Sequence, residues 1–148
     1  MSYSIRAAQK GDEKAIMRLI QALADYERAP EQVVNTSDNL AKDLFDDRVC
    51  DAFVSIVNDS IVGFALYFTN YSTWKGRCLY LEDLYVLDTY RHMGIGSALF
   101  EQVVKVAKER GVKRMDWQVL DWNEPAMTFY RKQKATLDPT WINGRLFF

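Results

Sequence analysis

Cysteine and histidine are scarce in this sequence, and their scarcity excludes several kinds of site. The 148 residues include two cysteines, Cys50 and Cys78, and one histidine, His92. Two distant thiols in a chain long enough to bury its own core indicate a reduced, cytoplasmic protein without disulfides. A zinc site needs about four ligands at close spacing, which this set does not provide, so we expect no metal. A thiol nucleophile would need His92 as its partner. That histidine lies in a glycine-containing loop, described below, where a position near a bound phosphate explains it better than catalysis does.

Long apolar runs and an excess of charge of one sign are also missing. No apolar stretch approaches the roughly 20 residues that span a bilayer, and residues 1–6 lack the apolar segment of a signal peptide. Nineteen basic residues against twenty acidic ones give a net charge of −1, which argues against a general nucleic-acid partner. The chain has no repeat or low-complexity stretch. We therefore expect a single domain over residues 1–148, with no membrane and no nucleic acid among its partners.

The spacing of apolar residues predicts a mixed α/β fold. The expected strands cover residues 3–7, 52–57, 61–69, 77–87, 115–120 and 145–148. The expected helices cover a segment from the Gly11-Asp12 turn to residues 25–30, then residues 37–45 capped by Ser37 or Asp38, 94–110 and 123–133. Consecutive strands pair antiparallel, and the later strand–helix–strand passage implies a parallel pair. The predicted fold class is α/β, with a mixed, mostly antiparallel twisted sheet flanked by helices.

A loop with two closely spaced glycines joins an apolar strand to the longest helix. It reads Arg91-His92-Met93-Gly94-Ile95-Gly96. The glycines let the backbone approach a ligand closely, and the N–H groups of residues 92–98 are expected to point outward where the helix dipole favours an anion. Arg91 adds a positive charge. Leu99 replaces the third glycine of the dinucleotide fingerprint, and no Gly-Lys-Ser/Thr is present. The loop is either a pyrophosphate site or a tight turn whose glycines permit close packing.

Two carboxylates, Glu82 and Asp83, interrupt the strand before this loop. A carboxylate is costly to bury without a partner. Neighbouring strand residues point to opposite faces, so we expect only one of the two to face a given cleft. The pair either forms ion pairs at the strand end or takes a proton from an amine, which cannot act as a nucleophile while it is an ammonium of pKa about 10.4.

These motifs together resemble the GNAT superfamily of N-acetyltransferases. The Arg-x-x-Gly-x-Gly turn is similar to that family's coenzyme A pyrophosphate loop. Residues 80–84, 122–126 with 129–130, 23–27 and 31–33 are similar to its diamine (spermidine/spermine) branch, which also contains thialysine acetyltransferases. The resemblance covers nearly the whole chain.

The resemblance implies a homodimer that uses acetyl-CoA, without a metal, in a direct attack by a small-molecule amine. It makes Glu82 the general base and Tyr130 the acid that protonates the leaving thiolate. The cofactor-binding residues it implies are Leu84, Tyr85, Val86, Arg91, His92, Met93, Gly94, Ile95, Gly96, Ser97, Asn123, Ala126 and Tyr130. The amine-binding residues it implies are Tyr26, Glu27, Trp74, Glu82 and Asp83.

Several of these assignments have a structural alternative. Tyr130 also fits a core position, Asn123 a helix cap, and Arg131 and Lys132 solvated side chains. Ser72 stands where the polyamine enzymes carry an acidic residue, and the sequence ends at residue 148 where they continue. A short diamine or a lysine-like amino acid is therefore at least as plausible an acceptor as a polyamine.

Two other functions stay open. A protein lysine or N-terminal acetyltransferase would need an open acceptor groove. A non-catalytic coenzyme A–binding module would need neither Glu82 nor Tyr130, and their presence argues against it.

Overall fold

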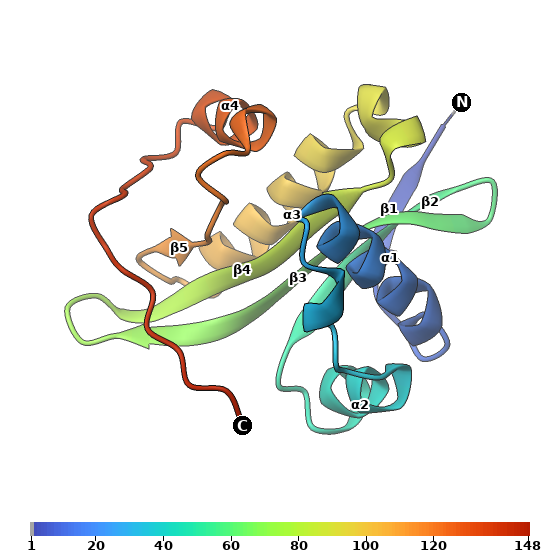
Figure 1. The fold of residues 1–148 in the computed structure, drawn as a ribbon, viewed down its shortest axis with the longest axis horizontal. Coiled ribbons are helices and arrows are strands. Elements are labelled where there is room, and N and C mark those ends of the chain that lie inside the picture. The colour runs from blue at the N-terminus through green and yellow to red at the C-terminus, as the bar shows by residue number, and fades with distance from the viewer. Residues whose placement is uncertain (1) are drawn as a thin grey trace. The chain divides into compact units, whose positions relative to one another are not determined.

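A five-stranded sheet organises the larger part of the protein (Figure 1). The computed structural model describes residues 2–148, which form two compact units, one ending at Trp117 and one from Gln118 to Phe148. The prediction that both belong to a single domain stays a prediction. The strands, in both spatial and chain order, are β1 (Ser4–Ala7), β2 (Asp51–Val57), β3 (Ser60–Ser72), β4 (Gly76–Val86) and β5 (Met115–Asp116).

The pairing of these strands confirms the predicted fold class. The pairs β1–β2, β2–β3 and β3–β4 are antiparallel, and β4–β5 is parallel. The turn between β2 and β3 holds Asn58 and Asp59 at φ of 48° and 65°. Two consecutive residues at positive φ match the twist of an antiparallel hairpin, and Asn and Asp tolerate that conformation best after glycine.

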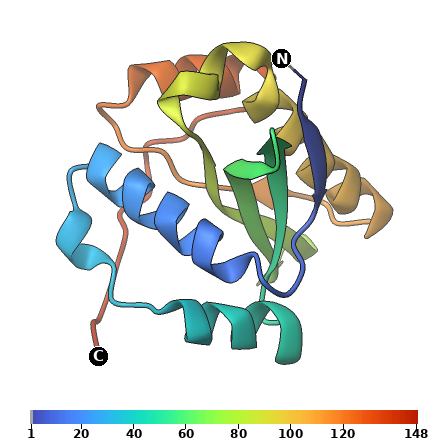
Figure 2. The same ribbon diagram turned by 90° about the vertical axis from the view of Figure 1, so that its right-hand side faces the viewer.

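Helices cover the two faces of the sheet (Figure 2). One face carries α1 (Glu13–Tyr26) and α2 (Ser37–Ala41), and the other carries α3 (Ile95–Glu109). Beyond α2 the helix widens over Lys42–Asp46, where the Asp47 N–H donates to the Lys42 carbonyl five residues back. The core under α1 and α2 contains Ile16, Leu19, Leu40, Leu44, Ala52, Val54, Phe64, Leu66 and Tyr85. The core residues of α3 are Ile95, Leu99, Phe100, Val103 and Ala107.

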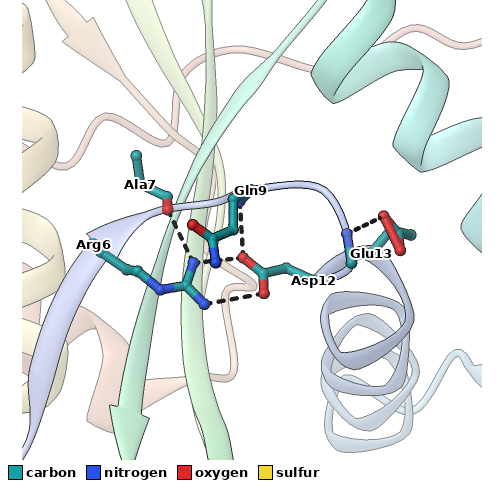
Figure 3. Close-up of polar contacts among 6 residues, drawn as sticks. Arg6, Ala7, Gln9, Asp12 and Glu13 are labelled. Atoms are coloured by element: carbon teal, nitrogen blue, oxygen red, sulfur yellow. Dashed lines mark hydrogen bonds and ion pairs between the residues drawn. The ribbon is translucent and has the colours of Figure 1, made fainter.

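A buried carboxylate fastens β1 to the start of α1 (Figure 3). Asp12 accepts hydrogen bonds from Arg6 Nη1 and Nη2 at 2.6 and 3.1 Å, and from the Gln9 N–H at 2.8 Å. Burial alone would raise the pKa of Asp12, but the bonds from Arg6 and Gln9 outweigh it and lower that pKa. The contact is a bidentate ion pair between residues close in sequence.

The smaller unit contains one helix, α4 (Glu124–Lys132). The Asn123 side chain caps it by accepting a hydrogen bond from the Ala126 N–H at 3.2 Å, so the cap alternative is confirmed. Arg131 Nη1 lies 3.9 Å from Glu124 Oε2 on the same helix. Among residues 2–148, no helix is both long and apolar enough to cross a bilayer.

The structure corrects three of the predicted elements. Thr36, rather than Ser37 or Asp38, caps α2, because its Oγ1 accepts the Asn39 N–H at 3.1 Å while Ser37 already lies in the first turn. The strand expected over residues 115–120 ends at Asp116. The strand expected over residues 145–148 is wrong, since residues 135–148 contain neither helix nor strand. Strand propensity in a short apolar segment is not sufficient where no neighbouring strand supplies hydrogen bonds.

Candidate functional site

The loop between β4 and α3 has the geometry of an anion site. A short helical turn, Asp88–Met93, runs into Gly94, whose φ of 79° and ψ of 10° are left-handed. No side chain among the described residues caps the start of α3. A Cβ built on Gly94 would meet no described atom within 4 Å, so the space beside it is open. Free N–H groups, an open approach and the positive end of a 15-residue helix together suit a phosphate.

The extent of this N–H cluster is smaller than expected. The Ala98 N–H donates to the Gly94 carbonyl at 3.1 Å and is therefore used within the helix, so the cluster ends at Ser97. Ile95 is fully buried, which leaves only its backbone to meet a ligand. Met93, Gly96 and Ser97 are half-buried and His92 is exposed.

The end of β4 presents backbone groups rather than side chains. Tyr85 and Val86 are buried, and Leu84 is half-buried. β5 pairs with β4 only at Leu79 and Tyr80, so within residues 2–148 no strand covers that edge of β4 farther along. An edge without a paired strand offers N–H and C=O groups to an extended ligand, which fits the amide-containing arm of coenzyme A.

A β-bulge lies at Glu82. Leu81 pairs with Tyr67 and Asp83 with Leu66, so Glu82 is an extra residue on β4. Residues directly opposite in a ladder share a face, and Leu66 and Tyr67 point to opposite faces, as neighbours do. Leu81 and Asp83 therefore face opposite sides although they are two residues apart. The expectation that only one of Glu82 and Asp83 can face a given cleft rested on regular alternation, which the bulge suspends.

The charges of Glu82 and Glu27 act on Asp83 at this bulge, and we call these three carboxylates the acidic group. Glu82 is exposed and Asp83 half-buried, while Glu27 lies at the end of α1. Burial, with the charges of Glu82 and Glu27, raises the pKa of Asp83 to about 7. Burial also raises the pKa of Glu27. Carboxylates that share a partly desolvated site favour a cation, because a positive charge relieves both their repulsion and their desolvation.

Arg91 makes contacts within the protein that were not expected from the sequence, and its predicted contact with a phosphate stays a prediction. Its Nη1 lies 2.7 Å from Asp88 Oδ1 and its Nε donates to the Val86 carbonyl at 2.9 Å. Its Cζ lies over the rings of Tyr26 and Tyr85, at 5.1 and 5.3 Å from their centroids. Asp88, which was not among the predicted site residues, is the acidic partner, and its spacing of three residues from Arg91 is the sequence signal for this pair.

Trp74 is not brought to the acidic group. It lies in the turn between β3 and β4, where its side chain is 86% exposed. Six residues of extended strand, about 20 Å, separate Gly76 at the start of β4 from Glu82. Within one chain, Trp74 and Glu82 cannot contact the same small amine.

The remaining predicted residues belong to the smaller unit. Tyr130 is buried, and its ring meets that of Phe129 edge to face at 5.2 Å between centroids. Asn123 is buried at the start of α4, and Ala126 lies in the first turn. No group of three or more His, Cys, Asp or Glu residues in the described chain is arranged to hold a metal ion.

The class of this protein is defined by a mixed sheet with a glycine loop at the head of a long helix. The model of the acetyltransferase (GNAT) family matches residues 16–134, and the chain belongs to that family. It is an N-acetyltransferase that takes its acetyl group from acetyl-CoA.

Curated relatives and a solved structure agree with this membership. The chain is 40% identical to a thialysine N-epsilon-acetyltransferase of Bos taurus, over 86% of this chain and 80% of the relative. It is 35% identical to the enzyme of that name from Mus musculus, over 97% and 92%. An aminoglycoside acetyltransferase from an uncultured soil metagenomic sample has the same fold, with a TM-score of 0.81 at 20% identity over 99% of this chain and 96% of that one.

Proposed function

We propose that the chain acetylates the side-chain amine of a small lysine-like amino acid, such as thialysine, or of a short diamine. The acidic group carries this proposal, because three carboxylates with one pKa raised to about 7 form a site for a compact ammonium. The relatives named for thialysine acetylation support it. Tyr26, next to Glu27, is part of the proposed amine site, and Arg91 already lies over its ring.

The catalytic roles follow from the chemistry of amine acylation. Acetyl-CoA, when bound, supplies the acetyl thioester. Glu82, exposed on the bulge, takes a proton from the ammonium so that the nitrogen lone pair is free to attack. As the new C–N bond forms and the C–S bond breaks, the Tyr130 phenol gives its proton to the departing sulfur, and the second proton lost by the acylated nitrogen restores the phenol. Asp83 and Glu27 hold the positive charge of the amine substrate.

The cofactor contacts follow from the loop. The N–H groups up to Ser97 would hold the pyrophosphate, and the backbone of Leu84 to Val86 would hold the pantetheine arm. We also propose a cytoplasmic homodimer. Two free thiols, Cys50 and Cys78, support the reducing compartment. The exposed apolar side chains among residues 141–148 support self-association, which light scattering on a gel-filtration column will measure.

An acceptor screen tests the proposal. Free thiol released from acetyl-CoA is followed with thialysine, lysine, ornithine, short diamines, spermidine and lysine peptides. We expect kcat/KM to be highest for the lysine-like amino acids or short diamines. Highest activity on peptides would instead assign a protein-modifying enzyme, and tight acetyl-CoA binding without turnover on any amine would assign a binding module.

A further inference from the structure

Arg91 reaches back from the loop before α3 to the sheet and to the end of α1. Its side chain contacts residues of three elements: Val86 and Tyr85 on β4, Asp88 in the loop, and Tyr26 on α1. Its side chain is 35% exposed. A guanidinium that donates a hydrogen bond, forms an ion pair and lies near two aromatic rings has few orientations open to it.

These contacts limit what Arg91 offers a phosphate. Arginine grips phosphate with two parallel N–H donors of its planar fork. Here Nε donates to the Val86 carbonyl and Nη1 meets the Asp88 carboxylate. A bidentate grip on phosphate through Nε would break the bond to Val86. The loop supplies backbone N–H groups for the phosphate without this side chain.

The two rings under Arg91 are neighbours of the acidic group. Tyr26 directly precedes Glu27 at the end of α1. Tyr85 pairs with Phe64 and Asp83 pairs with Leu66, and both partners belong to the core under α1. Tyr85 and Asp83 therefore share the face of the sheet that α1 covers. Arg91 joins the element that carries Glu27 to the strand that carries Asp83.

We propose that Arg91 is a positioning residue for the amine site: by holding Tyr26 and Tyr85 together, it fixes the separation of Glu27 and Asp83 and thereby the affinity for the amine. This inference rests on the proposed function and replaces the expectation that Arg91 contacts the cofactor's phosphates. Arg91 touches neither substrate in this role; it acts through the two tyrosines.

The kinetic test uses Arg91→Met, Arg91→Lys and Tyr26→Leu, with Arg77→Met on the exposed end of β4 as the control. We expect KM for the best amine to rise about tenfold in all three variants, the effect of one desolvated cation–π contact. Arg91→Lys should not restore the wild-type KM, because an ammonium lacks the planar fork whose separate N–H groups reach Val86 and Asp88. The dissociation constant of acetyl-CoA, measured by calorimetry, should stay within about twofold of wild type. The double variant Arg91→Met/Tyr26→Leu should be no worse than either single one.

A second readout needs no turnover. The carboxyl carbon of Asp83 is titrated by NMR in wild type, Arg91→Met and the milder Arg91→Lys. The groups that act on it are Glu82 on the same strand and Glu27, which directly follows α1. If Arg91 keeps the acidic group closed, its loss admits water and the pKa of Asp83 falls toward the ordinary aspartate value. Loss of a positive charge alone would raise that pKa.

These two readouts separate the inference from the reaction it serves. If no amine is acetylated by wild type, the proposed function fails, and a fall in the Asp83 pKa in the Arg91 variants would still support the inference. The inference is overturned if Arg91→Met weakens acetyl-CoA binding, Arg91→Lys restores it, and the Asp83 titration does not move.

Discussion

At the scale of single residues, Glu82 is proposed to take a proton from the amine substrate. An amine acceptor with a pKa of about 10.4 is almost entirely an ammonium at neutral pH. A general base therefore contributes most to the rate at neutral pH. Glu82→Gln keeps the size and hydrogen-bonding capacity of the side chain but cannot accept a proton. We expect its deficit in kcat/KM to be largest near neutral pH and to shrink as the pH approaches the pKa of the amine.

The measurement is kcat/KM against pH for wild type and Glu82→Gln with one good acceptor. Glu101→Gln, exposed on α3, is the matched control and should follow wild type. A deficit that stays constant with pH, with KM alone raised, would make Glu82 a binding residue and leave the base unassigned.

Asp83 gives a stability prediction with a definite sign. Its folded pKa of about 7 exceeds the unfolded value of about 3.9, so the folded state binds the extra proton between these two pH values. Asp83 therefore lowers stability progressively as the pH rises from about 4 to 7. Asp83→Asn should raise the free energy of unfolding by a few kcal/mol at pH 8 and by little at pH 4.

Urea unfolding at these two pH values measures the effect. Asp121→Asn, an exposed position, serves as the control and should change neither value. An equal change in Asp83→Asn at both pH values would show that packing, rather than protonation, sets its effect.

At the scale of elements, β2, β3 and β4 depend on close backbone approach at Gly63. A Cβ at this position would lie 2.7 Å from Ser55 Oγ and 2.9 Å from the Tyr85 carbonyl oxygen. Ser55 could rotate away, but the carbonyl belongs to the adjacent strand and cannot. We expect Gly63→Ala to cost about 2 kcal/mol of stability, measured by urea unfolding.

Gly144→Ala is the matched control, since a Cβ there would meet no described atom within 4 Å. Adding Ser55→Ala to Gly63→Ala should recover only part of the loss, because the clash with Tyr85 remains. Full recovery would assign the strain to the Ser55 hydroxyl alone.

Elements differ in how well their sequence predicts them. The helix after Gly94 and its end near Gly111, at φ of 69°, were predicted because periodicity, glycine and helix length are all local signals. The bulge at Glu82 had no such signal, since a bulge is a property of two paired strands. The Arg91 contacts with Tyr26 likewise join residues far apart in sequence. Local patterns thus located the loop and the carboxylates, but they did not predict the bulge or the contacts between Arg91 and α1.

For the whole molecule, acetyl-CoA should act as a stabilising ligand. Binding to the folded state alone adds about 2.7 kcal/mol at a concentration 100 times the dissociation constant, which raises Tm by roughly 9 °C for a chain of this size. Gly96→Val should abolish this rise, because its side chain obstructs the N–H cluster at the head of α3. Differential scanning fluorimetry with and without acetyl-CoA measures it.

The control for this experiment is the Tm of each protein without ligand, which separates a damaged fold from lost binding. Adenosine alone, which lacks the pyrophosphate, should give a much smaller rise in wild type. An undiminished rise in Gly96→Val would place the cofactor away from this loop.

The order of the strands also bears on how the chain folds. β2, β3 and β4 follow one another through short turns, so their pairing closes only small loops. β1 pairs later, because its partner β2 is far away in the sequence: residue 4 pairs with residue 56. Closing that long loop carries a larger entropy cost. The Arg6–Asp12 contact forms within a few residues and brings β1 and α1 together beforehand. We therefore expect the β2–β4 meander to form early, with β1 and α1 docking onto it later as one unit.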